Sequence, residues 1–276
     1  MQGEILLKKI IEDNKDKPHF YIRNLLKEYL QILILSYIYS SDKYKDLFFY
    51  GGTCLAHCYG LPRLSEDLDF VDTKKEVSMK NISEDISLFL QKETGLPVET
   101  KLHGFHIYFK LPIMKKLGLA KSDSESNYLF VKVEIFSDFS FCKSFKKELV
   151  TIFKYNRSVL VKTFDLPTLM STKIRAVLYR KWEKTDKKGE TLASVKGRDF
   201  FDLMWFLQNK IEPNLGCIEG VKNKKDLREK LLERVESIDK RSVKYDLTNF
   251  ISDQSFVDNL SGGIKNILKK ELQKWS

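Results

Sequence analysis

Cysteine and histidine are scarce in this chain of 276 residues, and their placement excludes several kinds of site. The four cysteines have neither the spacing of a disulfide framework nor that of a zinc site. The four histidines do not gather in the sequence, so neither a zinc cluster nor a histidine-based catalytic triad is indicated. Cys54 and Cys58 lie one helical turn apart, and we interpret them as small buried side chains of a helix rather than as a redox pair.

Long apolar runs are missing as well. The most apolar segment, 29–39, is too short to cross a bilayer and contains Gln31. The first ten residues, MQGEILLKKI, lack the apolar core and cleavage site of a signal peptide. With ordinary apolar content and no low-complexity region, the sequence predicts a folded cytoplasmic protein without a membrane partner.

Acidic residues are too few to balance the basic ones, and the net charge is +10. Residues 1–150 carry 22 basic and 21 acidic side chains, whereas residues 151–276 carry 26 and 17. Nearly all of the surplus therefore lies in the second half, which favours an acidic partner there, with nucleic acid as the first candidate. A general lysine bias of the source proteome is the alternative explanation.

The most informative stretch is residues 47–72, LFFYGGTCLAHCYGLPRLSEDLDFVD. Its apolar start, 47–50, predicts a buried strand, which Gly51 and Gly52 end. Thr53 is a good N-cap for a short helix over 54–59. A glycine turn that leads into a helix N-terminus presents free backbone N–H groups, so this turn is suited to bind phosphate.

Two carboxylates follow on the next predicted strand. Asp67 and Asp69 are two residues apart, and side chains at that spacing point to the same face of a strand. Such a pair repels unless a cation lies between the carboxylates. Hard oxygen ligands with room for substrate phosphates are what Mg²⁺ prefers, so the stretch predicts phosphoryl chemistry on a nucleotide.

The run GGT…RLSEDLDF resembles the signature of the AbiEii/AbiGii family of nucleotidyltransferase toxins. This family includes the MenT-like toxins and is a branch of the DNA polymerase β-like superfamily. A second match is the helix LMSTKIRAVLYRKW followed by RDFFDL, which resembles the later family motifs. The resemblance covers roughly residues 45–208, and past Pro213 nothing matches.

The resemblance implies a Mg²⁺-dependent (or Mn²⁺-dependent) enzyme that transfers a nucleoside monophosphate from an NTP to a hydroxyl, and it implies roles for individual residues. It assigns catalysis to Asp67, Asp69, Glu134, Lys173 and Asp199, and the metal to Asp67, Asp69 and Glu134. It assigns nucleotide binding to Gly51, Gly52, Thr53, Arg63, Ser65, Lys173, Arg180 and Asp202. Whether Asp199 or Asp202 is the functional acid stays open. Glu134 would help to bind a second metal ion or act as the base.

The remaining pattern predicts an α/β protein of two lobes. Residues 1–164 would form a nucleotidyltransferase-like domain with a mixed sheet, in which Glu134 lies on a strand over 128–136. Residues 165–276 would form a basic domain of helices only, with a charged loop over 184–196. Without the resemblance, Glu134 reads as a surface residue of an amphipathic strand, and Lys173 with Arg180 as a solvated helix face.

If the resemblance extends to biology, the chain is the toxin of a toxin–antitoxin system, and a cognate antitoxin would restrain it. Its acceptor would then be RNA, most simply the 3′ end of a tRNA. Alternatives are a protein or small-molecule hydroxyl as the acceptor, or a catalytically silent module that binds nucleotide or RNA.

Overall fold

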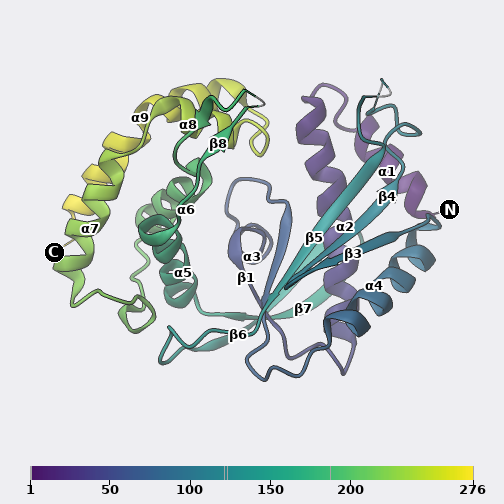
Figure 1. The fold of residues 1–276 in the computed structure, drawn as a ribbon, viewed down its shortest axis with the longest axis horizontal. Coiled ribbons are helices and arrows are strands. Elements are labelled where there is room, and N and C mark those ends of the chain that lie inside the picture. Colours follow the sequence, from purple (N-terminus) through teal and green to yellow (C-terminus); the bar gives the residue numbers. More distant parts are fainter. Residues whose placement is uncertain (1, 121, 123, 187, 276) are drawn as a thin grey trace. The chain divides into compact units, whose positions relative to one another are not determined.

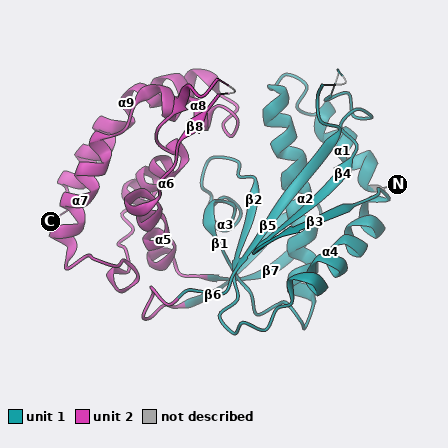
Figure 2. Cartoon of the chain, viewed as in Figure 1, with its two compact units in different colours: residues 1–139, 147–163 teal, residues 140–146, 164–276 magenta. Residues whose placement is uncertain are grey.

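The computed structural model describes residues 2–120, 122, 124–186 and 188–275. The chain divides into two compact units, shown in teal and magenta in Figure 2: unit 1 comprises residues 1–139 and 147–163, and unit 2 residues 140–146 and 164–276. The chain therefore enters unit 2 twice. The first of these segments, 140–146, is linked to the rest of unit 2 by a Cys142–Cys217 disulfide and by a 2.7 Å hydrogen bond from Asn214 Nδ2 to the Ser144 carbonyl oxygen.

Unit 1 is built on a mixed sheet, which confirms the predicted α/β class. Within the described residues the sheet has seven strands in the order β3-β4-β5-β2-β1-β7-β6. Strand β1 pairs antiparallel with β2 and parallel with β7, and β2 pairs parallel with β5. The strands are β1 (Phe48–Tyr50), β2 (Asp67–Val71), β3 (Glu99–His103), β4 (His106–Pro112), β5 (Tyr128–Phe136), β6 (Lys147–Lys154) and β7 (Arg157–Phe164).

The two faces of this sheet differ in polarity because side chains alternate along each strand. On β5 the buried positions are Leu129, Val131, Val133 and Ile135, and these alternate with Lys132 and Glu134. Helices pack together over the apolar face, where they bury its side chains (Figure 1). They are α1 (Gln2–Glu12), α2 (His19–Ser40) and α4 (Met79–Thr94). The polar side chains therefore belong to the other face, which is where the predicted carboxylates lie.

Unit 2 is mainly helical, and α6 packs against α5, α8 and α9. Three of its α-helices begin at an Asn or Asp whose side chain accepts a hydrogen bond from a backbone N–H of the first turn: Asn223, Asp239 and Asp253. No helix in the described ranges is long and apolar enough to span a membrane. The helices are α5 (Leu166–Tyr179), α6 (Gly197–Gln208), η1 (Leu215–Cys217), α7 (Lys224–Glu236), α8 (Lys240–Leu247) and α9 (Gln254–Gln273).

The prediction of helices only after residue 165 is wrong at one place. The segment expected as a loop over 184–196 contains a small antiparallel pair, β8 (Lys184–Thr185) and β9 (Thr191–Ala193). The Asp186 carboxylate holds the turn between them, because it accepts hydrogen bonds from the backbone N–H groups of Lys188 and Glu190. These strands are too short and too polar to produce the alternation that predicts a strand.

Candidate active site

The glycine turn places the start of α3 (Gly51–Tyr59) against the carboxylate of Asp69. Gly51 has φ +80°, which favours glycine, and a Cβ atom added there would lie 2.1 Å from Asp69 Oδ2. A side chain at this position would therefore be strained and would collide with the carboxylate. The absence of a Cβ lets Asp69 approach the backbone at the N-terminus of the helix, where anions are favoured.

Gly52 has a different neighbour. A Cβ atom there would lie 2.7 Å from Arg63 Nη2 and 3.0 Å from Ser65 Oγ. The Arg63 side chain is buried and donates from Nη1 to the Leu64 carbonyl oxygen at 2.9 Å, so it cannot easily move away. The structure thus brings three of the predicted nucleotide-binding residues together, and it places a guanidinium directly against the glycine backbone.

Thr53 is not the N-cap that the sequence predicted. The helix begins two residues earlier, at Gly51, and its N-cap residue is Tyr50, whose side chain makes no capping bond. The Thr53 hydroxyl instead donates to the main-chain carbonyl oxygen of Asp67. This bond fixes the first turn of α3 to the start of β2, the strand that carries the carboxylates, and it leaves the backbone N–H groups of the turn without a side-chain cap.

The three predicted metal ligands lie on one face of the sheet, on two adjacent strands. Asp67 and Asp69 share a face of β2, and the parallel register pairs Asp69 with Glu134 and Asp67 with Lys132 on β5. Burial raises the pKa of Asp67 above its ordinary value, and the nearby charge of Glu66 adds to this effect. A half-buried acid with other acids close by gains from a bound cation.

Lys132 now supplies the cation at this position. Its Nζ lies 3.0 Å from Asp67 Oδ2 and 2.5 Å from Glu134 Oε1. Burial disfavours the charge, but the two carboxylates outweigh it and raise the pKa of Lys132 above its ordinary value. From the next strand, His106 Nε2 lies 3.3 Å from the same Glu134 oxygen. Neither Lys132 nor His106 was assigned a role from the sequence.

The donor set suits a hard divalent cation. Asp67, Asp69 and Glu134 offer carboxylate oxygens, and the lack of a side chain at Gly51 leaves room for the Asp69 carboxylate itself. Within the described part of the chain, no three acidic, histidine or cysteine side chains already converge as a metal cluster. The Lys132 ammonium bridges two of the three carboxylates. A metal ion would take over their neutralisation from Lys132.

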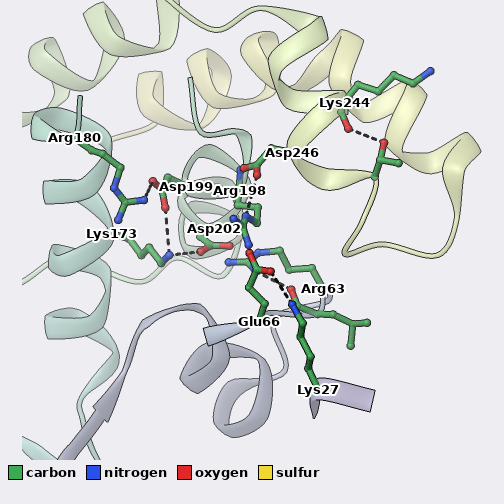
Figure 3. Close-up of polar contacts among 12 residues, drawn as sticks. Lys27, Arg63, Glu66, Lys173, Arg180, Arg198, Asp199, Asp202, Lys244 and Asp246 are labelled. Carbon is green, nitrogen blue, oxygen red and sulfur yellow. Dashed lines mark hydrogen bonds and ion pairs between the residues drawn. The ribbon is translucent and has the colours of Figure 1, made fainter. Parts of the chain in front are cut away.

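The other predicted site residues belong to unit 2 and form a cluster of balanced charge (Figure 3). Lys173 Nζ lies 3.4 Å from Asp199 Oδ1 and 2.7 Å from Asp202 Oδ2. Arg180 donates from Nη1 to Asp199 Oδ2 at 2.5 Å. Asp199 and Asp202 are 2% and 0% exposed, so two buried acids are held by two bases joining α5 to α6. Both candidate acids therefore contact Lys173.

Two other ion pairs drawn in Figure 3, one in each unit, have structural roles. Arg198 Nε lies 3.1 Å from Asp246 Oδ1, and the Arg198 backbone N–H also donates to this carboxylate, which ties α6 to α8. In unit 1, Lys27 pairs with Glu66 at 3.2 Å and holds the segment before β2 on α2. The hydrogen bond from Gln31 Nε2 to the Ser65 carbonyl oxygen, 3.0 Å, has the same effect.

Comparison with known proteins identifies a family for this chain and a solved structure of similar fold. The family model described as "Nucleotidyl transferase AbiEii toxin, Type IV TA system" matches residues 33–273. Among solved structures, MenT4, a nucleotidyltransferase toxin from Mycobacterium tuberculosis, is similar in fold with a TM-score of 0.58 at 12% identity, covering 98% of this chain and 90% of MenT4. JHP933 from Helicobacter pylori aligns with a TM-score of 0.46 at 19% identity, over 91% and 94% of the two chains. No curated protein sequence gives a significant match.

The family model spans most of the chain, including the glycine turn, the paired aspartates and the Lys173 cluster. The resemblance inferred from the motifs is thereby confirmed, but its expected limits of roughly 45–208 are too narrow, because the match continues past Pro213. The chain belongs to the AbiEii family and is a nucleotidyltransferase toxin of a type IV toxin–antitoxin system.

Proposed function

We propose that this enzyme transfers a nucleoside monophosphate from an NTP to a hydroxyl of RNA, at the 3′ end of a tRNA, in a Mg²⁺-dependent reaction. One observation carries the proposal: Asp67, Asp69 and Glu134 share one face of the sheet, and Asp69 lies against the uncapped glycine turn that begins α3. A phosphate site beside three carboxylates is the arrangement that nucleotidyl transfer needs.

In unit 1, the backbone N–H groups of Gly51, Gly52 and Thr53 would bind the phosphates, and Arg63 and Ser65 would support that turn from behind Gly52. Asp67, Asp69 and Glu134 would hold Mg²⁺ or Mn²⁺. When bound, the metal would neutralise charge on the phosphates. These residues bind and orient, so catalysis would consist mainly of positioning and charge neutralisation.

The reaction forms a bond between the acceptor oxygen and the α-phosphorus and breaks the bond to the β-phosphate, so pyrophosphate leaves. The acceptor hydroxyl loses its proton, and we assign Glu134 as the base that takes it, oriented by His106. The alternative role of Glu134, as a ligand of a second metal ion, uses the same carboxylate.

In unit 2, we assign Lys173, Arg180, Asp199 and Asp202 to nucleotide binding and to the orientation of the reacting groups. Because Lys173 is held by both acids, Asp199 and Asp202 would act together to fix its ammonium rather than one acid acting alone. A cognate antitoxin encoded with the chain, as is usual for a toxin–antitoxin pair, would restrain the enzyme in the cytoplasm.

The experiment measures which labelled phosphate of the NTP is transferred to tRNA. The purified enzyme is incubated with Mg²⁺, total tRNA and each NTP carrying label on the α- or the γ-phosphate. We expect α-label to enter tRNA and γ-label to stay out. Asp69→Asn, which keeps the shape but removes one charge, should reduce incorporation at least a hundredfold and abolish the Mg²⁺-dependent rise in melting temperature that NTP causes.

Three outcomes decide between the alternatives. Label in protein or in a small molecule rather than in tRNA would identify a different acceptor. Nucleotide binding without transfer to any acceptor would indicate a silent binding module. No Mg²⁺-dependent stabilisation by any NTP would refute the assignment of the carboxylates.

A further inference from the structure

A pocket of unit 2 collects positive charge that the reaction proposed above does not use. The pocket has a volume of about 230 Å³ and lies where α5 ends and α6 begins. Its lining includes four basic residues, one tryptophan and one acidic residue: Arg180, Lys181, Lys196, Arg234, Trp182 and Asp199.

The acid in this lining cannot balance the bases. The Asp199 carboxylate is already bound by Arg180 and Lys173, so that part of the pocket is neutral. In the described ranges, neither Lys181 nor Lys196 has a side-chain ion pair. Arg234 donates a hydrogen bond from Nε to the Val177 carbonyl oxygen at 2.9 Å, and its terminal nitrogens have no carboxylate partner among the described residues. Three positive charges around one concave surface are therefore left over.

Burial and the positive charge around the pocket disfavour the protonated form of Lys196. Its side chain is half-buried beside the N-terminus of α6, where the helix dipole is also unfavourable for a cation. Burial lowers the pKa of Lys196 to about 8, and the charge of Arg198 contributes to the same shift. A lysine that is held close to other cations and away from water is stabilised when an anion binds beside it.

The chemistry of the lining selects the anion. A guanidinium and an ammonium that converge on one small site suit the oxygens of a phosphate group. Trp182 adds a partly exposed indole, and an aromatic ring next to cations is how proteins bind the bases and backbone of single strands. Of the residues that we assign to the NTP, Arg180 and Asp199 line the pocket but are paired with each other. Lys173 does not line it and is turned to Asp199 and Asp202.

We propose that this pocket binds one phosphate of the single-stranded end of the RNA acceptor, through Lys196 and Arg234, with the adjoining base stacked on Trp182. The inference rests on the proposed function for the identity of the acceptor. It adds a binding site for that acceptor, located wholly in unit 2. The triphosphate of the NTP offers the same phosphate chemistry, so the experiment must separate the two sources.

The probe is a fluorescein-labelled single-stranded RNA of twelve nucleotides, titrated with the full-length protein without NTP and followed by fluorescence anisotropy. Lys196→Met and Arg234→Gln should each raise the Kd about tenfold, because a hydrogen bond to a charged group is lost. Each should also lower the slope of log affinity against log salt by about 0.7, the value for one phosphate contact of a single strand. Trp182→Leu should weaken binding about tenfold and leave that slope unchanged.

The matched control is Lys270→Met, which removes an exposed lysine of α9 outside the pocket. It should change the Kd less than twofold. Lys196→Arg, which keeps the charge, should recover most of the affinity, and unchanged melting temperatures show that the variants fold. The Kd for NTP with Mg²⁺, measured by calorimetry, should be the same in all of them.

Two results would overturn the proposal. One is RNA binding that is undetectable in the wild type or insensitive to both Lys196→Met and Trp182→Leu. The other is a loss of NTP affinity in place of RNA affinity, which would make the triphosphate the occupant. Because binding is measured without turnover, pocket-dependent RNA binding in a protein that transfers nothing to RNA would refute the proposed reaction and leave the pocket assignment standing.

Discussion

Replacement of Lys173 by methionine is expected to destabilise unit 2 as well as to impair activity. Lys173 holds Asp199 and Asp202, which are almost completely buried, and Arg180 contacts only the first of them. Lys173→Met keeps most of the side-chain volume but removes the ammonium that contacts both buried carboxylates. The negative charge of the two acids is then less well compensated in the interior of the α5–α6 contact.

The size of the effect follows from the cost of breaking a buried ion pair, about 3–5 kcal/mol of unfolding free energy. For a chain of this size, each 1 kcal/mol shifts the melting temperature by about 2–4 °C, so Lys173→Met should melt about 6–20 °C below the wild type. Loss of activity in this variant would therefore not by itself show that Lys173 touches the nucleotide.

A second substitution separates the two roles. Lys173→Met combined with Asp202→Asn restores the charge balance, since Arg180 and Asp199 remain paired. This double variant should recover most of the unfolding free energy in a urea titration, but it should not recover nucleotidyl transfer if Lys173 binds the NTP. If Lys173→Met melts like the wild type, or the double variant is no more stable than the single one, the argument from charge balance is refuted.

Two further predictions concern unit 1. Lys132→Met removes the ammonium that competes for Asp67 and Glu134, so Mn²⁺ should bind about tenfold more tightly. Binding is followed by the electron paramagnetic resonance of free Mn²⁺. Weaker binding would mean that Lys132 instead holds the carboxylates in place. Burial lowers the pKa of His57 to about 3, and the charge of Lys154 acts in the same direction. In the unfolded chain His57 takes up a proton near pH 6.5, whereas in the folded chain it stays neutral. The free energy of unfolding therefore decreases as the pH falls below 6.5. At pH 5 the wild type should have lost about 2 kcal/mol more than His57→Gln in urea unfolding, and parallel losses would refute the assignment.

The sheet face that carries Asp67, Asp69 and Glu134 shows how much of the site could be predicted from the sequence. The two-residue spacing of Asp67 and Asp69 is a local property, so their shared face could be predicted, as could the strand over 128–136 that carries Glu134. The partner of Glu134 could not be predicted, because β2 and β5 are separated by α4 and two strands, and alternation does not fix a register between distant strands. The bridge from Lys132 to Asp67 depends on that register and was therefore missed.

Other differences have local causes. Thr53 satisfies the usual preference for an N-cap, but its hydroxyl reaches Asp67 on a neighbouring strand, and such a tertiary bond overrides a local preference. The Cys142–Cys217 pair is separated by 75 residues, and spacing alone gives no reason to pair these two cysteines. Lys173 and Arg180 look like a solvated helix face in sequence because the acids that pair with them, Asp199 and Asp202, come from the next helix.

The position of β1 in the sheet has a consequence for the growing chain. This strand, which ends at the glycine turn, lies between β2 and β7, and β7 is complete only at Phe164. Until that residue has been synthesised, a nascent chain presents an open edge carrying Phe48 and Phe49, which are buried in the finished protein. Unpaired apolar edges are prone to associate with other chains, so ribosome-bound intermediates of this toxin need protection until more than half of the chain has been synthesised. A truncated mRNA that ends before the codon of Phe164 encodes a product in which β1, the strand that leads to Gly51, lacks its complete partner strand β7.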